Sequence, residues 1–167
     1  CSNPRHRTIL TTIYATGLRV SELCQLKVSD VDSKRMMLRI GNGKGGKDRY
    51  ALLSPKLLDT LRIYWHAFRP QIWLFPNKAG DGPITDNQVQ RYFYSAKQRA
   101  NIHKQGGIHS LRHAFATHLL DSGVDLHSIS RLMGHNHLST TARYLHLQQQ
   151  VVKTDSPLDL LSNLSKL

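Results

Sequence analysis

The sequence of 167 residues is poor in cysteine and has no long apolar run, and both shortages exclude classes of protein. Its two cysteines, Cys1 and Cys24, allow at most one bridge, which is too few for a disulfide-stapled scaffold. No stretch of about 18 apolar residues is uninterrupted, and the first residues lack a signal-peptide pattern. We therefore expect a soluble cytoplasmic protein, with Cys24 as a buried thiol and no membrane partner.

Acidic residues are also scarce, with 11 Asp and Glu against 23 Lys and Arg, for a net charge of +12. Such an excess attracts polyanions through phosphate neutralisation and counterion release. A basic solubilising surface or attraction to anionic lipid would give the same balance. Because no clean basic amphipathic helix with an aromatic apolar face is present, nucleic acid is the favoured partner.

The length suits one domain with a single core. The sequence begins CSNPRHR without an initiator methionine, so we expect a piece of a longer protein.

Apolar spacing predicts a mainly helical chain. Helices are expected within residues 1–27, with a sharp junction at residues 17–19, then from Pro55, over 86–99, from Ser110 to Gly123, and over 125–133. In the Pro55 helix the predicted buried positions are Leu57, Leu58, Leu61, Tyr64 and Trp65. Short β-like runs at 36–40 and 49–53 flank GNGKGGKD, a glycine-rich hairpin tip. The expected fold class is α+β, mainly α with a small antiparallel sheet or hairpin.

HSLRH, residues 109–113, places basic groups at the expected start of a helix. With Ser110 as the N-cap, His109 and Arg112 would lie where free N–H groups and the positive end of the helix dipole favour an anion. GLRVSEL similarly places Arg19 at a helix start, with Glu22 three residues later. For Arg19, a surface pair with Glu22 is the commoner explanation, and for Arg112 the alternative is an ordinary basic first turn.

Lys44 and Lys47 lie on the hairpin tip, which has neither the spacing of a P-loop nor its following helix. A lysine there could swing onto a leaving oxygen, or could simply be solvated.

GHNHLSTTARYLH, residues 134–146, gathers three histidines and Tyr144. His109 and His113 have the helical spacing of a metal-ligand pair, but the Glu of H-E-x-x-H is absent, and we expect no metal. A tyrosine nucleophile needs help to act, and a core or interface role is the alternative for Tyr144.

Together ATGLRVSEL (15–23), GKGGKDR (43–49), HSLRHAFATHLL (109–120) and LMGHNHLSTTARYLH (132–146) resemble the catalytic domain of tyrosine recombinases, the phage integrase family. The resemblance spans nearly the whole chain. It implies a catalytic core over residues 1–149 and a tail over 150–167 that could be exchanged between protomers. The family's N-terminal DNA-clamping domain is absent from this sequence.

The resemblance implies a role for each matching residue. Arg19 and Arg112 are the catalytic arginines, Lys44 is the hairpin lysine with Lys47 as its competitor, and His109 is the histidine of H-x-x-R. His135 belongs to the L-x-G-H motif, and Tyr144 is the nucleophile.

The implied reaction is site-specific recombination of double-stranded DNA through a 3′-phosphotyrosyl intermediate, with no cofactor, metal or ATP. Assembly on DNA as a tetrameric synapse, in association with the nucleoid, is expected. Type IB topoisomerase activity, a catalytically silent DNA-binding module and a metal-dependent nuclease are the alternatives. The predicted DNA-binding residues are Lys47, Arg49, Asn87, Gln90 and Arg91, of which the last three have side chains suited to base edges or to a merely solvated helix face.

Overall fold

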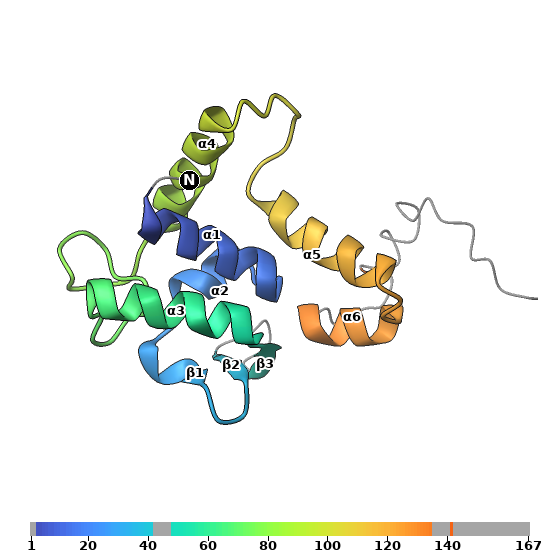
Figure 1. Cartoon of the computed structure of the whole chain (residues 1–167), viewed down its shortest axis with the longest axis horizontal. Helices are drawn as coiled ribbons and strands as arrows, with labels where there is room; N and C mark the ends of the chain where they lie inside the picture. Colours follow the sequence, from blue (N-terminus) through green and yellow to red (C-terminus); the bar gives the residue numbers. More distant parts are fainter. Residues whose placement is uncertain (1–2, 42–47, 135–140, 142–167) are drawn as a thin grey trace, which may run out of the picture.

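The computed structural model describes residues 3–41, 48–134 and 141, which form a mainly helical domain with a small sheet (Figure 1). The predicted α+β class is thereby confirmed. The elements are α1 (Pro4–Thr16), α2 (Val20–Cys24), the 3-10 turn η1 (Val28–Asp30), β1 (Val31–Asp32), β2 (Met37–Ile40), β3 (Arg49–Leu52), α3 (Pro55–Phe68), α4 (Asp86–Arg99), α5 (His109–Asp121) and α6 (Leu126–Met133).

Helix α1 lies at the centre of the domain and packs against α3, α4 and α5 (Figure 1). Asn3 caps its start by accepting hydrogen bonds from the N–H groups of Arg5 and His6. The helix ends at Gly17, whose φ of 64° is left-handed, and this produces the predicted sharp turn into α2.

Threonines share the buried face of α1 with Ile9 and Ile13, which the apolar spacing alone did not predict. Thr8, Thr12 and Thr16 are buried because each hydroxyl donates to the carbonyl four residues earlier. Tyr14 lies four residues after Leu10, a spacing that favours the apolar face of this helix, yet it is 40% exposed.

The sheet has the antiparallel order β1-β2-β3, and β1 is a short strand that the sequence did not predict. In the β2–β3 pair, Leu38 opposes Ala51, and both side chains are buried. The neighbouring pair, Met37 and Leu52, lies on the exposed face, as strand alternation requires.

Helix α3 begins as predicted, with the Ser54 hydroxyl accepting from the Leu57 N–H and Pro55 in the first position. Leu57, Leu58, Leu61 and Tyr64 are buried. The prediction for Trp65 was wrong, because its side chain is 36% exposed and the Arg69 guanidinium lies 4.3 Å from its ring centroid. This stacking covers part of the ring outside the core.

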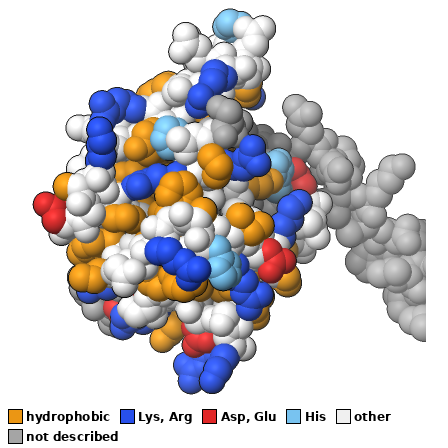
Figure 2. Space-filling view, turned by 60° about the vertical axis from the view of Figure 1, so that its left-hand side comes forward, with side chains coloured by type: hydrophobic (Ala, Val, Ile, Leu, Met, Phe, Trp, Pro, Cys, Tyr) orange, Lys and Arg blue, Asp and Glu red, His pale blue; other side chains and the backbone are white. Residues whose placement is uncertain are grey.

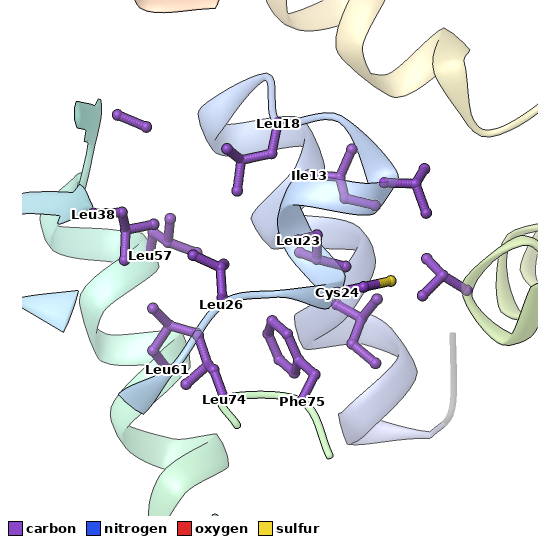
Figure 3. Packing of buried hydrophobic residues seen from close by; sticks show 14 of the residues in the cluster. Ile13, Leu18, Leu23, Cys24, Leu26, Leu38, Leu57, Leu61, Leu74 and Phe75 are labelled. Carbon is purple, nitrogen blue, oxygen red and sulfur yellow. The ribbon is translucent and has the colours of Figure 1, made fainter. Parts of the chain in front are cut away.

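The apolar residues form two clusters. The main core joins α1–α4 to the sheet, with Ile13, Leu23 and Phe75 among its members (Figure 3). A smaller cluster is shared by α5 and α6, and its buried members are Phe115, Ala116, Leu120, Ile129 and Met133.

Cys24 is buried in the main core, as predicted (Figure 3). Burial and a hydrogen bond with Asp86 raise the pKa of its thiol to about 12. The thiol is therefore protonated at neutral pH.

None of the helices in residues 3–41 and 48–134 combines the length and apolar character needed to cross a bilayer.

Candidate active site

The C-terminal end of α6 is the point where arginines from three separate parts of the chain meet. The last carbonyls of a helix lack partners within it and carry the negative end of its dipole, so they attract cations. Arg19 donates to the Gly134 carbonyl at 3.4 Å, and Arg49 donates to the Leu132 carbonyl at 2.7 Å. Arg112 donates to the Met133 carbonyl at 2.7 Å.

Gly134 ends α6 in the left-handed conformation, with φ of 63°. A Cβ at this position would lie 2.5 Å from Cδ of Arg49 and 2.6 Å from its Nε. The arginine side chain therefore packs directly over the glycine, which has room for it only because it lacks a side chain.

Arg19 follows the Gly17 turn and precedes α2. Its Nη1 lies 2.9 Å from Glu22 Oε1, and its backbone N–H donates to Oε2 at 2.8 Å. Arg19 and Glu22 therefore form the ion pair that their spacing favours. Because Glu22 is only 9% exposed, the carboxylate of this pair is buried and the pair is not a surface pair. The Arg19 side chain is 36% exposed, so part of this anchored guanidinium faces solvent.

Arg112 projects from the first turns of α5 into the interior and is only 8% exposed. Its Nη1 donates to the Gly17 carbonyl and its Nη2 to Met133. A buried guanidinium needs such acceptors to offset lost hydration. Arg112 thus fixes the α1–α2 turn relative to the end of α6.

His109 opens α5 and is exposed. The prediction of Ser110 as the N-cap was wrong, since the cap position is Ile108, two residues earlier, and the helix starts at His109. Ile108 is buried in the main core, and this packing fixes where the helix begins.

Glu22 also contacts Arg49, whose Nη2 lies 2.8 Å from Oε2. Burial raises the pKa of Glu22, but the charges of Arg49 and Arg19 and the hydrogen bonds that both donate outweigh it. The resulting pKa lies below its ordinary value, so Glu22 is an anion shared by two cations.

The contact between Arg49 and Glu22 was not predicted from the sequence. The alternation of side chains along β3 does indicate that Arg49 points inward. Arg49 and Ala51 share one face of β3, and Ala51 is buried in the core. Arg49 accordingly points inward, with a side chain only 14% exposed. Its assignment as a DNA-binding residue stays a prediction.

Helix α4 carries the other predicted DNA-reading residues that are described. Its start is capped by Thr85, which accepts from the Gln88 N–H. Asn87, Gln90 and Arg91 are exposed and line one shallow hollow. On the face shown in Figure 2, Lys and Arg side chains clearly outnumber acidic ones.

Lys44, Lys47, His135 and Tyr144 lie outside the described residues. In residues 3–41, 48–134 and 141, no three His, Cys, Asp or Glu side chains are grouped so that they could hold a metal ion.

Comparison with known protein families assigns a class to this helical domain, with its three-stranded sheet and its arginines gathered at one helix end. The model of the phage integrase family matches residues 1–151. The chain therefore belongs to the phage integrase family, and its fold is that of a tyrosine recombinase catalytic domain.

Two curated relatives are similar in sequence. The y4eF protein of Sinorhizobium fredii, whose name places it with integrases and recombinases, is 49% identical over 94% of this chain and 63% of its own length. Tyrosine recombinase XerC of Halalkalibacterium halodurans is 40% identical over 86% of this chain and 50% of its own length.

Two solved structures are similar in fold. XerA recombinase matches with a TM-score of 0.80 and 32% identity, over 89% of this chain and 54% of that one. XerH recombinase bound to the palindromic difH substrate matches with a TM-score of 0.78 and 28% identity, over 88% of this chain and 43% of that one. The chain thus spans between 43% and 63% of the length of these four proteins.

Proposed function

We propose that the whole protein is a site-specific DNA recombinase that cleaves and rejoins strands through a covalent bond to Tyr144. Residues 1–149 would form the catalytic core and 150–167 a tail exchanged between protomers. An upstream domain would clamp the DNA.

One observation carries this proposal: the Arg19 and Arg112 guanidiniums donate to the adjacent carbonyls of Gly134 and Met133. Arg19 and Arg112 are 93 positions apart in the chain, yet both bind the residues that directly precede His135 in the sequence. Two guanidiniums side by side can bind the two non-bridging oxygens of one phosphodiester. They stabilise the charge that builds up on those oxygens when a nucleophile adds to phosphorus.

The proposed step is a transesterification at a DNA phosphodiester. The Tyr144 oxygen forms a bond to phosphorus as the bond from phosphorus to the 5′ oxygen breaks. His109 takes the phenol proton, Lys44 or its competitor Lys47 protonates the leaving 5′ oxygen, and His135 donates a hydrogen bond to the phosphate.

The reverse step joins the strands. A 5′ hydroxyl from a partner strand attacks the 3′-phosphotyrosine and releases Tyr144. The bond energy is kept in the phosphotyrosyl link, and the arginines supply the electrostatic stabilisation, so the reaction needs neither ATP nor metal.

DNA binding is supported by the net charge of +12 and by the exposed Asn87, Gln90 and Arg91 on α4. XerH, which this chain resembles, is described as bound to a DNA substrate. We propose that this protein likewise binds double-stranded DNA, assembles on it as a tetrameric synapse and acts at the cytoplasmic nucleoid.

The test is covalent capture. The full-length protein is incubated with a pool of nicked duplexes of randomised sequence, so that the short fragment carrying the released 5′ hydroxyl diffuses away and the adduct is trapped. Denaturing electrophoresis isolates the adduct, sequencing identifies the site, and mass spectrometry locates the modified residue. We expect phosphotyrosine at Tyr144 and no adduct with Tyr144→Phe.

An undiminished adduct with Tyr144→Phe, or no adduct with the wild type, would overturn the proposal. Two captured sites placed on separate duplexes then test strand exchange. Relaxation of supercoiled DNA without any exchange would assign the protein to the topoisomerases instead.

A further inference from the structure

Arg49 stands at the start of β3, directly after the hairpin tip in sequence, and its guanidinium reaches two distant parts of the chain. Nη1 donates to the Leu132 carbonyl at 2.7 Å, and Nη2 lies 2.8 Å from Glu22 Oε2. The first contact holds the last turn of α6 and the second holds α2. One side chain thus connects three elements that contribute to the candidate active site.

Glu22 passes the effect of Arg49 to Arg19. Its Oε2 accepts from Arg49 and from the backbone N–H of Arg19, while its Oε1 binds the Arg19 guanidinium. At 9% exposure the carboxylate is held by these two arginines more than by water. Removing Arg49 would leave a buried anion with half its neutralising charge, and its position would change.

The contacts distinguish this role from a DNA contact. Both terminal nitrogens of Arg49 are engaged with the protein, and one of them binds the Glu22 carboxylate, which neutralises its charge. The Arg49 side chain is 14% exposed. Its Cδ, Nε and Cζ atoms pack over Gly134.

We propose that Arg49 is a positioning residue, which sets the place of the Arg19 guanidinium through Glu22 and that of the C-terminal end of α6 through the Leu132 carbonyl. The inference rests on the proposed function, in which Arg19 and His135 act on the phosphate. It assigns Arg49 to assembly of the site rather than to DNA binding.

Arg49→Lys separates the two roles because it keeps the charge but loses the planar fork. A single ammonium on a flexible stem can neutralise phosphate, but it cannot span Glu22 and the Leu132 carbonyl with fixed geometry. A DNA-contact role predicts near wild-type behaviour for the lysine variant, and a positioning role predicts a slower chemical step.

The experiment measures adduct formation at saturating nicked substrate, on preformed protein–DNA complexes, so that only folded and bound molecules count. We expect Arg49→Lys to slow the reaction about 10²-fold, since misplacement by about 1 Å can cost that much. The Kd for DNA, measured by fluorescence anisotropy, should change by less than about threefold, because no phosphate contact is lost. Arg35→Ala, which removes a 76% exposed arginine, is the matched control and should leave the rate unchanged.

Glu22→Gln provides the second arm. Because Arg49 acts partly through Glu22, the double variant with Arg49→Lys should be slowed by less than the product of the two single effects. Arg49→Lys and Glu22→Gln are used in place of Arg49→Ala, because removing the whole side chain could prevent folding.

A wild-type rate for Arg49→Lys, a loss confined to Kd, or additive effects in the double variant would overturn the inference while leaving the proposed function intact. Failure of the wild type to form any adduct would instead remove the proposed function and this inference with it.

Discussion

The ring of Phe115 on α5 lies directly against Gly17 at the end of α1. A Cβ at position 17 would stand 2.4 Å from Cδ1 of that ring and 2.7 Å from Cε1. Gly17 also has φ of 64°, a conformation that costs side-chain-bearing residues about 1–2 kcal/mol. The turn that presents Arg19 therefore depends on a glycine for two independent reasons.

Gly17→Ala should accordingly lower the free energy of unfolding by about 2–5 kcal/mol, the sum of backbone strain and overpacking. Urea unfolding followed by circular dichroism measures it. Gly80→Ala is the control, because Gly80 also has positive φ but nothing lies within 4 Å of a Cβ there. Equal losses in the two variants would mean that the Phe115 contact contributes nothing.

The carboxylate of Glu22 should make stability depend on pH. Burial raises its pKa, but the charges and hydrogen bonds of Arg49 and Arg19 lower it below the ordinary value of 4.5. A carboxylate whose pKa is lower in the folded state stabilises the protein above the unfolded pKa, and this contribution is lost as pH falls through the folded pKa.

The difference in unfolding free energy between wild type and Glu22→Gln should therefore be largest near about pH 7 and shrink toward about pH 3. Asp59→Asn removes a 70% exposed carboxylate and is the control, for which a small difference at every pH is expected. A difference for Glu22→Gln that grows on acidification would contradict the assignment.

Arg112→Lys should harm both the fold and the reaction. The guanidinium reaches the carbonyls of Gly17 and Met133 together, and a lysine can satisfy only part of this pair. A loss of about 1–3 kcal/mol in stability is expected from the unsatisfied buried acceptor. Adduct formation should fall about 10²–10³-fold, the typical effect of removing a donor to a developing charge. A variant that is destabilised but forms adduct at the wild-type rate would confine Arg112 to a structural role.

Arg91 on α4 offers a test of sequence reading. If it binds a base edge, Arg91→Ala should reduce discrimination between the captured site and unrelated DNA by about 1–3 kcal/mol. Competition binding at fixed salt measures this, and Arg35→Ala serves again as the charge control. Uniform weakening on all sequences would instead assign Arg91 to the phosphate backbone.

Features determined by neighbours in the chain were predicted well from the sequence. The helix starts at Pro55 and Asp86, the break at Gly17 and the end of α6 at Met133 follow from side chains and backbone preferences within one turn. The prediction of Ser110 as the cap was wrong because the burial of Ile108, two residues earlier, outweighed the capping preference of serine.

Features determined by distant contacts were missed. Arg49 meets a carbonyl 83 positions away, and nothing in its local pattern identifies that partner. The family resemblance supplied Arg19 and Arg112 but not the carbonyls to which they bind. Trp65 lies at a position with core spacing, yet Arg69 covers its ring from the solvent side.

The two separate apolar clusters have a consequence for how the domain comes apart. Helices α5 and α6 share a small core of their own. They are linked to the rest by arginine-to-carbonyl bonds, by the Phe115–Gly17 contact, and by the packing of α5 on α1 and of Leu111 on the main core. This pair can detach as a cooperative unit while the main core stays closed. Its amide hydrogens should exchange before those of α1 and α3, and catalytic competence should disappear in denaturant ahead of global unfolding.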